Sequence, residues 1–140
     1  MTFLIFAFIL PAFAQDKVDI FGYYSIVKAP KAFSDISELH LGGDYGEMQN
    51  PKFYGFIRMK SKRALDFRLL KPSLNGKNFT FSTKTVGKIN YKFVGTFTRL
   101  GDFPELKPNG EIVLKGTLSK YRGKKRIASA YVKFSYFAGD

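Results

Sequence analysis

The stretch Lys88–Leu100, KINYKFVGTFTRL, alternates apolar and polar residues along most of its length. Successive side chains of a β-strand point to opposite sides, so Ile89, Tyr91 and Phe93 share one face of an extended chain. The polar residues between them share the other face. A helix with this spacing would scatter the apolar residues around its axis. The stretch therefore predicts a strand with one buried face and one solvated face.

The same two-residue period recurs along the chain and predicts about eight strands. The pair Asn75-Gly76 is the clearest hairpin signal, because both residue types tolerate the positive φ that a tight β-turn needs. Besides the first stretch, the expected strands cover Val18–Val27, Ser37–Leu41, Phe53–Lys60, Leu65–Leu70, residues 77–86, Ile112–Tyr121 and Arg126–Phe137.

The links between these strands are too short for the crossover helices of a parallel sheet, so the predicted class is all-β and antiparallel. Two single-domain architectures stay open: a β-sandwich, or a partly closed β-barrel that is lipocalin-like in outline. Glycines inside strands mark bends or close backbone approach and favour the curled barrel. Such glycines are Gly22, Gly55, Gly95 and Gly116.

Residues 1–14 have the pattern of a cleaved signal peptide. An apolar run, Phe3–Leu10, is followed by Pro11 and by Ala12-Phe13-Ala14, the small-x-small pattern before a cleavage site. The run is shorter than the roughly 20 residues of a membrane-spanning helix. We expect cleavage after Ala14, a single domain over residues 15–140, and a secreted or periplasmic location. The chain has no cysteine, so packing must stabilise this domain without disulfides.

The chain is strongly basic, with a formal net charge of +12. Two groups of cations lie at predicted turns. They can be interpreted as solvated hairpin tips without a binding role, or as residues that contact an anion. These candidate anion-contacting residues are Lys60, Lys62, Arg63, Arg122, Lys124, Lys125 and Arg126. Export argues against nucleic acid as the partner. It favours lipid head groups, glycans or anionic polymers of the cell envelope as partners. A membrane surface is one such partner.

The segment Phe53–Lys60 is apolar on both faces at its start. Such a strand is either covered by another segment or borders a ligand pocket or contact patch. Together with the aromatic face of Lys88–Leu100, it gives the candidate ligand-binding residues. These are Tyr54, Phe56, Arg58, Tyr91 and Phe93.

Catalytic signals are weak, and we expect no metal site or cofactor. His40 is the only histidine, and the acid pairs Asp35/Glu38, Asp44/Glu47 and Asp102/Glu105 fall in predicted turns or beside them. The sequence favours an exported, non-enzymatic β-domain that binds an apolar, amphipathic or anionic envelope ligand. Two alternatives stay open: an eight-stranded outer-membrane barrel and a small secreted hydrolase that uses an acid pair or His40.

Overall fold

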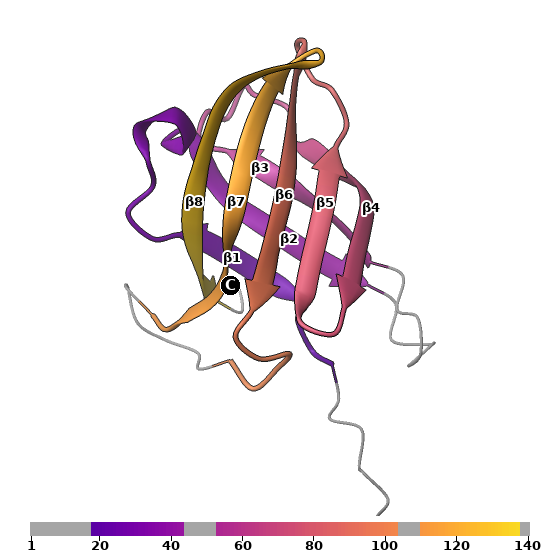
Figure 1. The fold of residues 1–140 in the computed structure, drawn as a ribbon. Helices are drawn as coiled ribbons and strands as arrows, with labels where there is room; N and C mark the ends of the chain where they lie inside the picture. Colours follow the sequence, from indigo (N-terminus) through magenta and orange to yellow (C-terminus); the bar gives the residue numbers. More distant parts are fainter. Residues whose placement is uncertain (1–17, 44–52, 104–109, 138–140) are drawn as a thin grey trace, which may run out of the picture.

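The computed structural model describes residues 18–43, 53–103 and 110–137. They form a closed barrel of eight antiparallel strands, which Figure 1 shows from the side. The prediction of an all-β, single-domain antiparallel barrel is confirmed, and the sandwich alternative is wrong. The strands are β1 (Gly22–Ile26), β2 (Ile36–Gly43), β3 (Phe53–Met59), β4 (Phe67–Asn75), β5 (Asn78–Thr83), β6 (Ile89–Phe97), β7 (Ile112–Arg122) and β8 (Lys125–Phe137).

Each strand pairs with the next one along the chain, and β1 pairs with β8 to close the barrel. The longest regular ladder joins β6 to β7, with Ile89 opposite Arg122 and Phe97 opposite Leu114. The shortest joins β3 to β4, where Phe56 pairs with Arg68 and Ile57 with Phe67. A closed barrel leaves no long unpaired edge.

The interior is packed with aromatic side chains. Tyr91, Phe93 and Phe97 of β6 all point inward and are at most 1% exposed, as the alternation predicted. The ring of Phe97 lies 6.0 Å from that of Tyr24, although their strands β6 and β1 are not neighbours. An eight-stranded barrel is just wide enough for its interior to be filled by side chains. Ring contacts of this kind across the interior produce that filling here.

A pair of glycines makes room for the ring of Phe93. Gly95 and Gly116 lie opposite each other on β6 and β7. A Cβ on Gly116 would come within 2.3 Å of the Val94 carbonyl oxygen and 2.9 Å of the Phe93 ring. The expectation that glycines inside strands mark close approach is confirmed at this position.

The β4–β5 hairpin is shifted from its predicted position by one residue. Asn75 pairs with Asn78, so the turn consists of Gly76 and Lys77, and only Gly76 has positive φ. The start of this hairpin is also irregular, because the β4–β5 register shifts between Leu70 and Ser73. Pro72 lies in this interval and has no N–H to donate to the ladder.

The two ends of the barrel differ in what connects the strands. One end, which we call the basic end, carries the 3₁₀ helix η1 (Lys31–Phe33) and the connections 60–66, 84–88 and 123–124. The other, which we call the closed end, carries the β4–β5 turn and residues 18–21 and 98–103. In the described part of the chain, no helix is long and apolar enough to cross a membrane.

Candidate anion-binding site

All seven predicted anion-contacting residues lie at the basic end. Lys60, Lys62 and Arg63 belong to the β3–β4 connection, and the other four flank or form the β7–β8 turn. Sequence positions about 60 residues apart are brought to the same end because β3 and β7 run in the same direction up the barrel.

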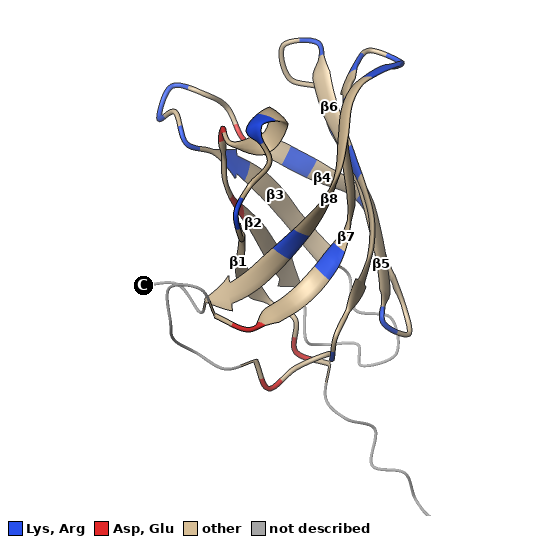
Figure 2. Ribbon diagram, turned by 60° about the vertical axis from the view of Figure 1, so that its left-hand side comes forward, with Lys and Arg blue, Asp and Glu red and all other residues tan. Residues whose placement is uncertain are grey.

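The basic end also holds cations that the sequence prediction did not include. Lys28 precedes η1, Lys31 is its first residue, and Lys84 and Lys88 lie in the β5–β6 connection, so eleven exposed cations face solvent here. Only two acidic residues, Asp35 and Asp66, belong to the same connections. None of the eleven cations forms an ion pair with another described residue. Figure 2 shows these blue segments on the upper loops, with a few red ones among them.

Hydrogen bonds join two of the basic connections to each other. The β5–β6 turn has positive φ at both Gly87 and Lys88, which is the geometry of a tight primed turn. The Gly123 N–H donates to the Lys88 carbonyl oxygen at 2.9 Å, and the Asn90 side-chain amide donates to the Gly123 carbonyl oxygen at 3.0 Å. These bonds hold the backbone of Lys88 against the β7–β8 turn. The cations of both turns therefore project from one rigid unit.

The structure separates the five predicted ligand-binding residues. Tyr91 and Phe93 lie inside the barrel and are buried, whereas Tyr54, Phe56 and Arg58 point outward from β3. The five do not surround one common space. The ring of Tyr54 lies against the backbone of Gly42, its partner on β2, so it covers a glycine on the outer wall.

The outer wall carries a row of four rings in contact that the sequence prediction missed. Phe137, Tyr23, His40 and Phe56 lie side by side on four neighbouring strands. Their successive ring centroids are 5.4, 4.4 and 4.9 Å apart. The Arg58 guanidinium lies 5.0 Å from the centre of the Phe56 ring. The outer two contacts are stacked and the Tyr23–His40 contact is tilted by 48°, and together they stabilise the β8–β1–β2–β3 wall.

His40 lies in the middle of this row, and its surroundings favour the neutral form. Burial lowers the pKa of His40 below its ordinary value of 6.5. Glu38 opposes this effect, and Arg58 adds to it. Glu38 itself accepts a 3.0 Å hydrogen bond from Arg58. The histidine is thus embedded in the row of rings and, among the described residues, its Nδ1 atom has no hydrogen-bond partner.

The hydrolase alternative gains no site from this geometry. Among the residues that the structure describes, no three histidine, cysteine or acidic side chains come together as metal ligands would. The predicted acid pair Asp44/Glu47 and the residue Glu105 lie outside the described residues. Asp35 and Glu38 stand on either side of a register shift in β2, and Glu38 is engaged by Arg58.

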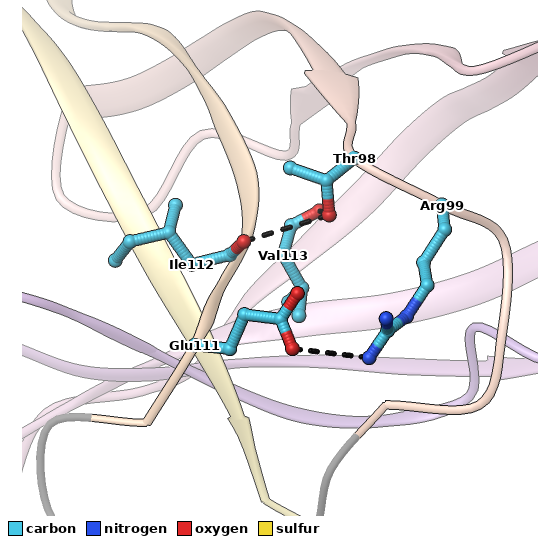
Figure 3. Close-up of polar contacts among 5 residues, drawn as sticks. All are labelled: Thr98, Arg99, Glu111, Ile112 and Val113. Carbon is cyan, nitrogen blue, oxygen red and sulfur yellow. Dashed lines mark hydrogen bonds and ion pairs between the residues drawn. The ribbon is translucent and has the colours of Figure 1, made fainter.

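The closed end has a different electrostatic character, because its described charges are few and partly paired. Arg99 and Glu111 form an ion pair at 3.0 Å across the β6–β7 connection. Figure 3 shows this pair beside Thr98, whose hydroxyl approaches the carbonyl oxygens of Ile112 and Val113 at 3.5 and 3.4 Å. These contacts fasten the start of β7 to the end of β6.

In comparisons with known proteins, no family model, no curated protein and no solved structure matches this chain. The candidate site therefore rests on the geometry and charge described above.

Proposed function

We propose that this protein is an exported, non-enzymatic barrel that uses its basic end to bind phosphate-bearing anionic surfaces of the cell envelope. The observation that supports this best is the set of eleven exposed cations at one end of the barrel, none of which forms an ion pair with another residue that the structure describes. Export belongs to the proposal and is based on residues 1–14, which lie outside the described residues.

The energetics favour a surface over a single small anion. Each lysine or arginine held near an anionic membrane surface contributes about 1 kcal/mol, and the attraction fades over roughly one Debye length, about 8 Å at physiological salt. Cations spread over four connections of one barrel end can meet such a surface together. Four simultaneous contacts would give about a thousandfold preference for an anionic over a neutral surface.

The outer-membrane alternative has less support from the orientation of the side chains. Membrane barrels present an apolar band to lipid and keep polar side chains inside. Here the interior is apolar, and the wall exposes Lys92, Lys115 and Lys133. A lysine facing lipid near the bilayer centre costs about 2–4 kcal/mol. This arrangement favours a barrel whose wall faces water.

Vesicle sedimentation tests the proposal. We expect the protein to bind phosphatidylcholine vesicles that contain about 30% phosphatidylglycerol, and to leave pure phosphatidylcholine vesicles unbound. The double variant Lys124→Glu/Lys125→Glu should weaken binding at least tenfold, because it reverses two charges on the joined turns. Raising the salt concentration should weaken binding of the unmodified protein progressively.

A matched control separates the basic end from overall charge. Lys115 and Lys133 are exposed partners on the barrel wall, opposite each other on β7 and β8. The variant Lys115→Glu/Lys133→Glu changes the net charge by the same amount, and we expect it to reduce binding less than about threefold. Equal losses in both double variants would contradict a site at the basic end. Equal binding to both kinds of vesicle would contradict the proposed function itself.

A further inference from the structure

A buried hydroxyl lies beneath the basic end without a hydrogen-bond partner. The Tyr91 side chain is 0% exposed, and its hydroxyl has no partner within the described structure. Its ring packs against Phe67 and Phe33, with centroid distances of 4.9 and 6.4 Å. The other large buried tyrosine, Tyr24, donates its hydroxyl hydrogen to the Ile20 carbonyl oxygen. A buried hydroxyl without a partner loses the hydrogen bonds it would make in water, so its place at Tyr91 requires an explanation.

The sheet register places cations on the same side of the wall as Tyr91. Lys120 is the direct cross-strand partner of Tyr91, and Arg122 is the next inward position of β7. Lys125 of β8 pairs with Arg122. Side chains of cross-strand partners point to the same face of a sheet. Tyr91 and three cationic residues therefore belong to the inner rim, the inner face of the barrel wall at its basic end, and Asp35 is the acidic group that acts on the Tyr91 hydroxyl.

The cover over this rim is a short segment with local hydrogen bonds. Phe33 of η1 is fully buried against Tyr91. Within the described chain, the hydrogen bonds of η1 and Ser34 stay inside the segment: Phe33 N–H donates to Pro30, and Ser34 donates to Lys31. Displacing η1 therefore breaks the ring contact of Phe33 but no ladder hydrogen bond of the barrel.

We propose that the inner rim, formed by Tyr91, Lys120, Arg122 and Lys125, is a binding site for a phosphate group and that η1 covers this site. The neutral phenol donates to a phosphate oxygen, and the three cations balance its charge. A hydrogen bond to a charged acceptor is stronger than one to a neutral acceptor. The site deepens the proposed function and rests on it, because it assigns phosphate recognition to particular side chains of the basic end.

Two opposite effects of one conservative variant test this site. Tyr91→Phe keeps the ring and the net charge and removes only the hydroxyl. We expect it to raise the melting temperature of the free protein, because the unpartnered hydroxyl is gone. We also expect about a tenfold loss of affinity for dihexanoyl phosphatidylglycerol, measured by isothermal titration calorimetry, because one charge-assisted hydrogen bond is lost. The same titration with inorganic phosphate shows whether the phosphate group alone is sufficient.

Lys120→Gln supplies an independent readout, with Lys92→Gln as its matched control on the outer face of the same ladder. Lys120→Gln should lower the affinity for both probes, and Lys92→Gln should change these affinities by less than about twofold. Sensitivity to Tyr91→Phe with either probe supports the site: loss with both identifies phosphate itself, and loss with the phospholipid alone identifies a lipid head group. Unchanged affinity of Tyr91→Phe and Lys120→Gln for both probes would overturn the site, while anionic vesicle binding would still leave the proposed function standing.

Discussion

The two ends of the barrel are both covered by aromatic side chains, but they differ in how their tyrosine hydroxyls and charged side chains are paired. At the closed end, Tyr24 donates to Ile20, and Arg99 is paired with Glu111 through its Nη2 atom, although its Nε atom has no partner among the described residues. At the basic end, the hydroxyl of Tyr91 has no partner, and eleven exposed cations have no acidic partner among the described residues. Most buried polar groups in proteins are hydrogen-bonded, so the unpartnered Tyr91 hydroxyl requires an explanation. This difference is the basis of our proposal that the basic end binds a ligand.

Deleting one buried ring at each end should show the largest difference. Phe97 and Phe33 are both 0% exposed. Phe97→Ala removes a ring from the strand core, between Tyr24 and Phe79, and should cost about 3–5 kcal/mol of unfolding free energy. Phe33→Ala should cost only about 1–2 kcal/mol, because the short segment around η1 can settle into the space left behind. Urea unfolding followed by circular dichroism measures both values.

Val113→Ala is a control for this comparison, because it is a smaller deletion in a fully buried position at the closed end. If burial in the strand core sets the cost, the loss of unfolding free energy for Val113→Ala should lie between the losses for Phe33→Ala and Phe97→Ala. Equal losses for Phe97→Ala and Phe33→Ala would mean that η1 is as rigid a part of the core as β6, and the contrast between the ends would fail.

Removing the hydroxyl of the closed-end tyrosine should have a moderate effect. Tyr24→Phe leaves the buried Ile20 carbonyl oxygen without its donor, so it should destabilise the protein by about 1–2 kcal/mol. Burial raises the pKa of both tyrosines, with Tyr136 adding to the effect at Tyr24 and Asp35 at Tyr91, so both phenols stay neutral at physiological pH. Thermal unfolding of Tyr24→Phe should thus shift downward, opposite in sign to Tyr91→Phe. A shift of the same sign in both variants would contradict the distinction.

The smallest effect concerns the wall between the ends, where His40 lies in its row of rings. The pKa of His40 is lower in the folded protein than in the unfolded chain, where it is 6.5. The unfolded state then binds the proton first as the pH falls. Stability should be constant above the unfolded pKa and should decrease slightly as the pH falls from 6.5 towards the lower folded pKa. Unfolding midpoints between pH 7 and pH 5 measure this decrease.

His40→Phe should remove that pH dependence and keep the row of rings intact. Its midpoint should therefore stay level over the interval in which the unmodified protein loses stability. A decrease of equal size in both proteins would assign the effect to the carboxylates, and His40 would have no part in it.

The barrel could be predicted from the sequence because its signal is local. Alternation in Lys88–Leu100 defines the inner face of β6, and short links between such segments require antiparallel neighbours. The strand pattern also indicates which connections share one end of the barrel, although the sequence prediction did not use this. In a barrel whose strands pair in chain order, every second connection falls at the same end. The turns at residues 60–66, 84–88 and 123–124 therefore had to share one end, together with their cations.

The details of the site could not be read in this way, because they depend on register. Whether Tyr91 lies opposite Lys120 or opposite a neighbouring residue of β7 is decided by the position of the β6–β7 ladder. The contact between the rings of Tyr23 and His40 likewise depends on which residues of β1 and β2 pair. The prediction that grouped Tyr54 with Tyr91 joined two aromatic positions from opposite faces of the wall.

Mapping amide chemical shifts during a titration with dihexanoyl phosphatidylglycerol tests the central claim most directly, because it reports on both ends and on the wall in one experiment. Our account predicts that the perturbed amides cluster in residues 28–35, 60–63, 84–91 and 120–126, all at the basic end or next to it. Perturbations centred on residues 19–24 and 97–103, or on the outer wall around Tyr54 and Phe56, would contradict it.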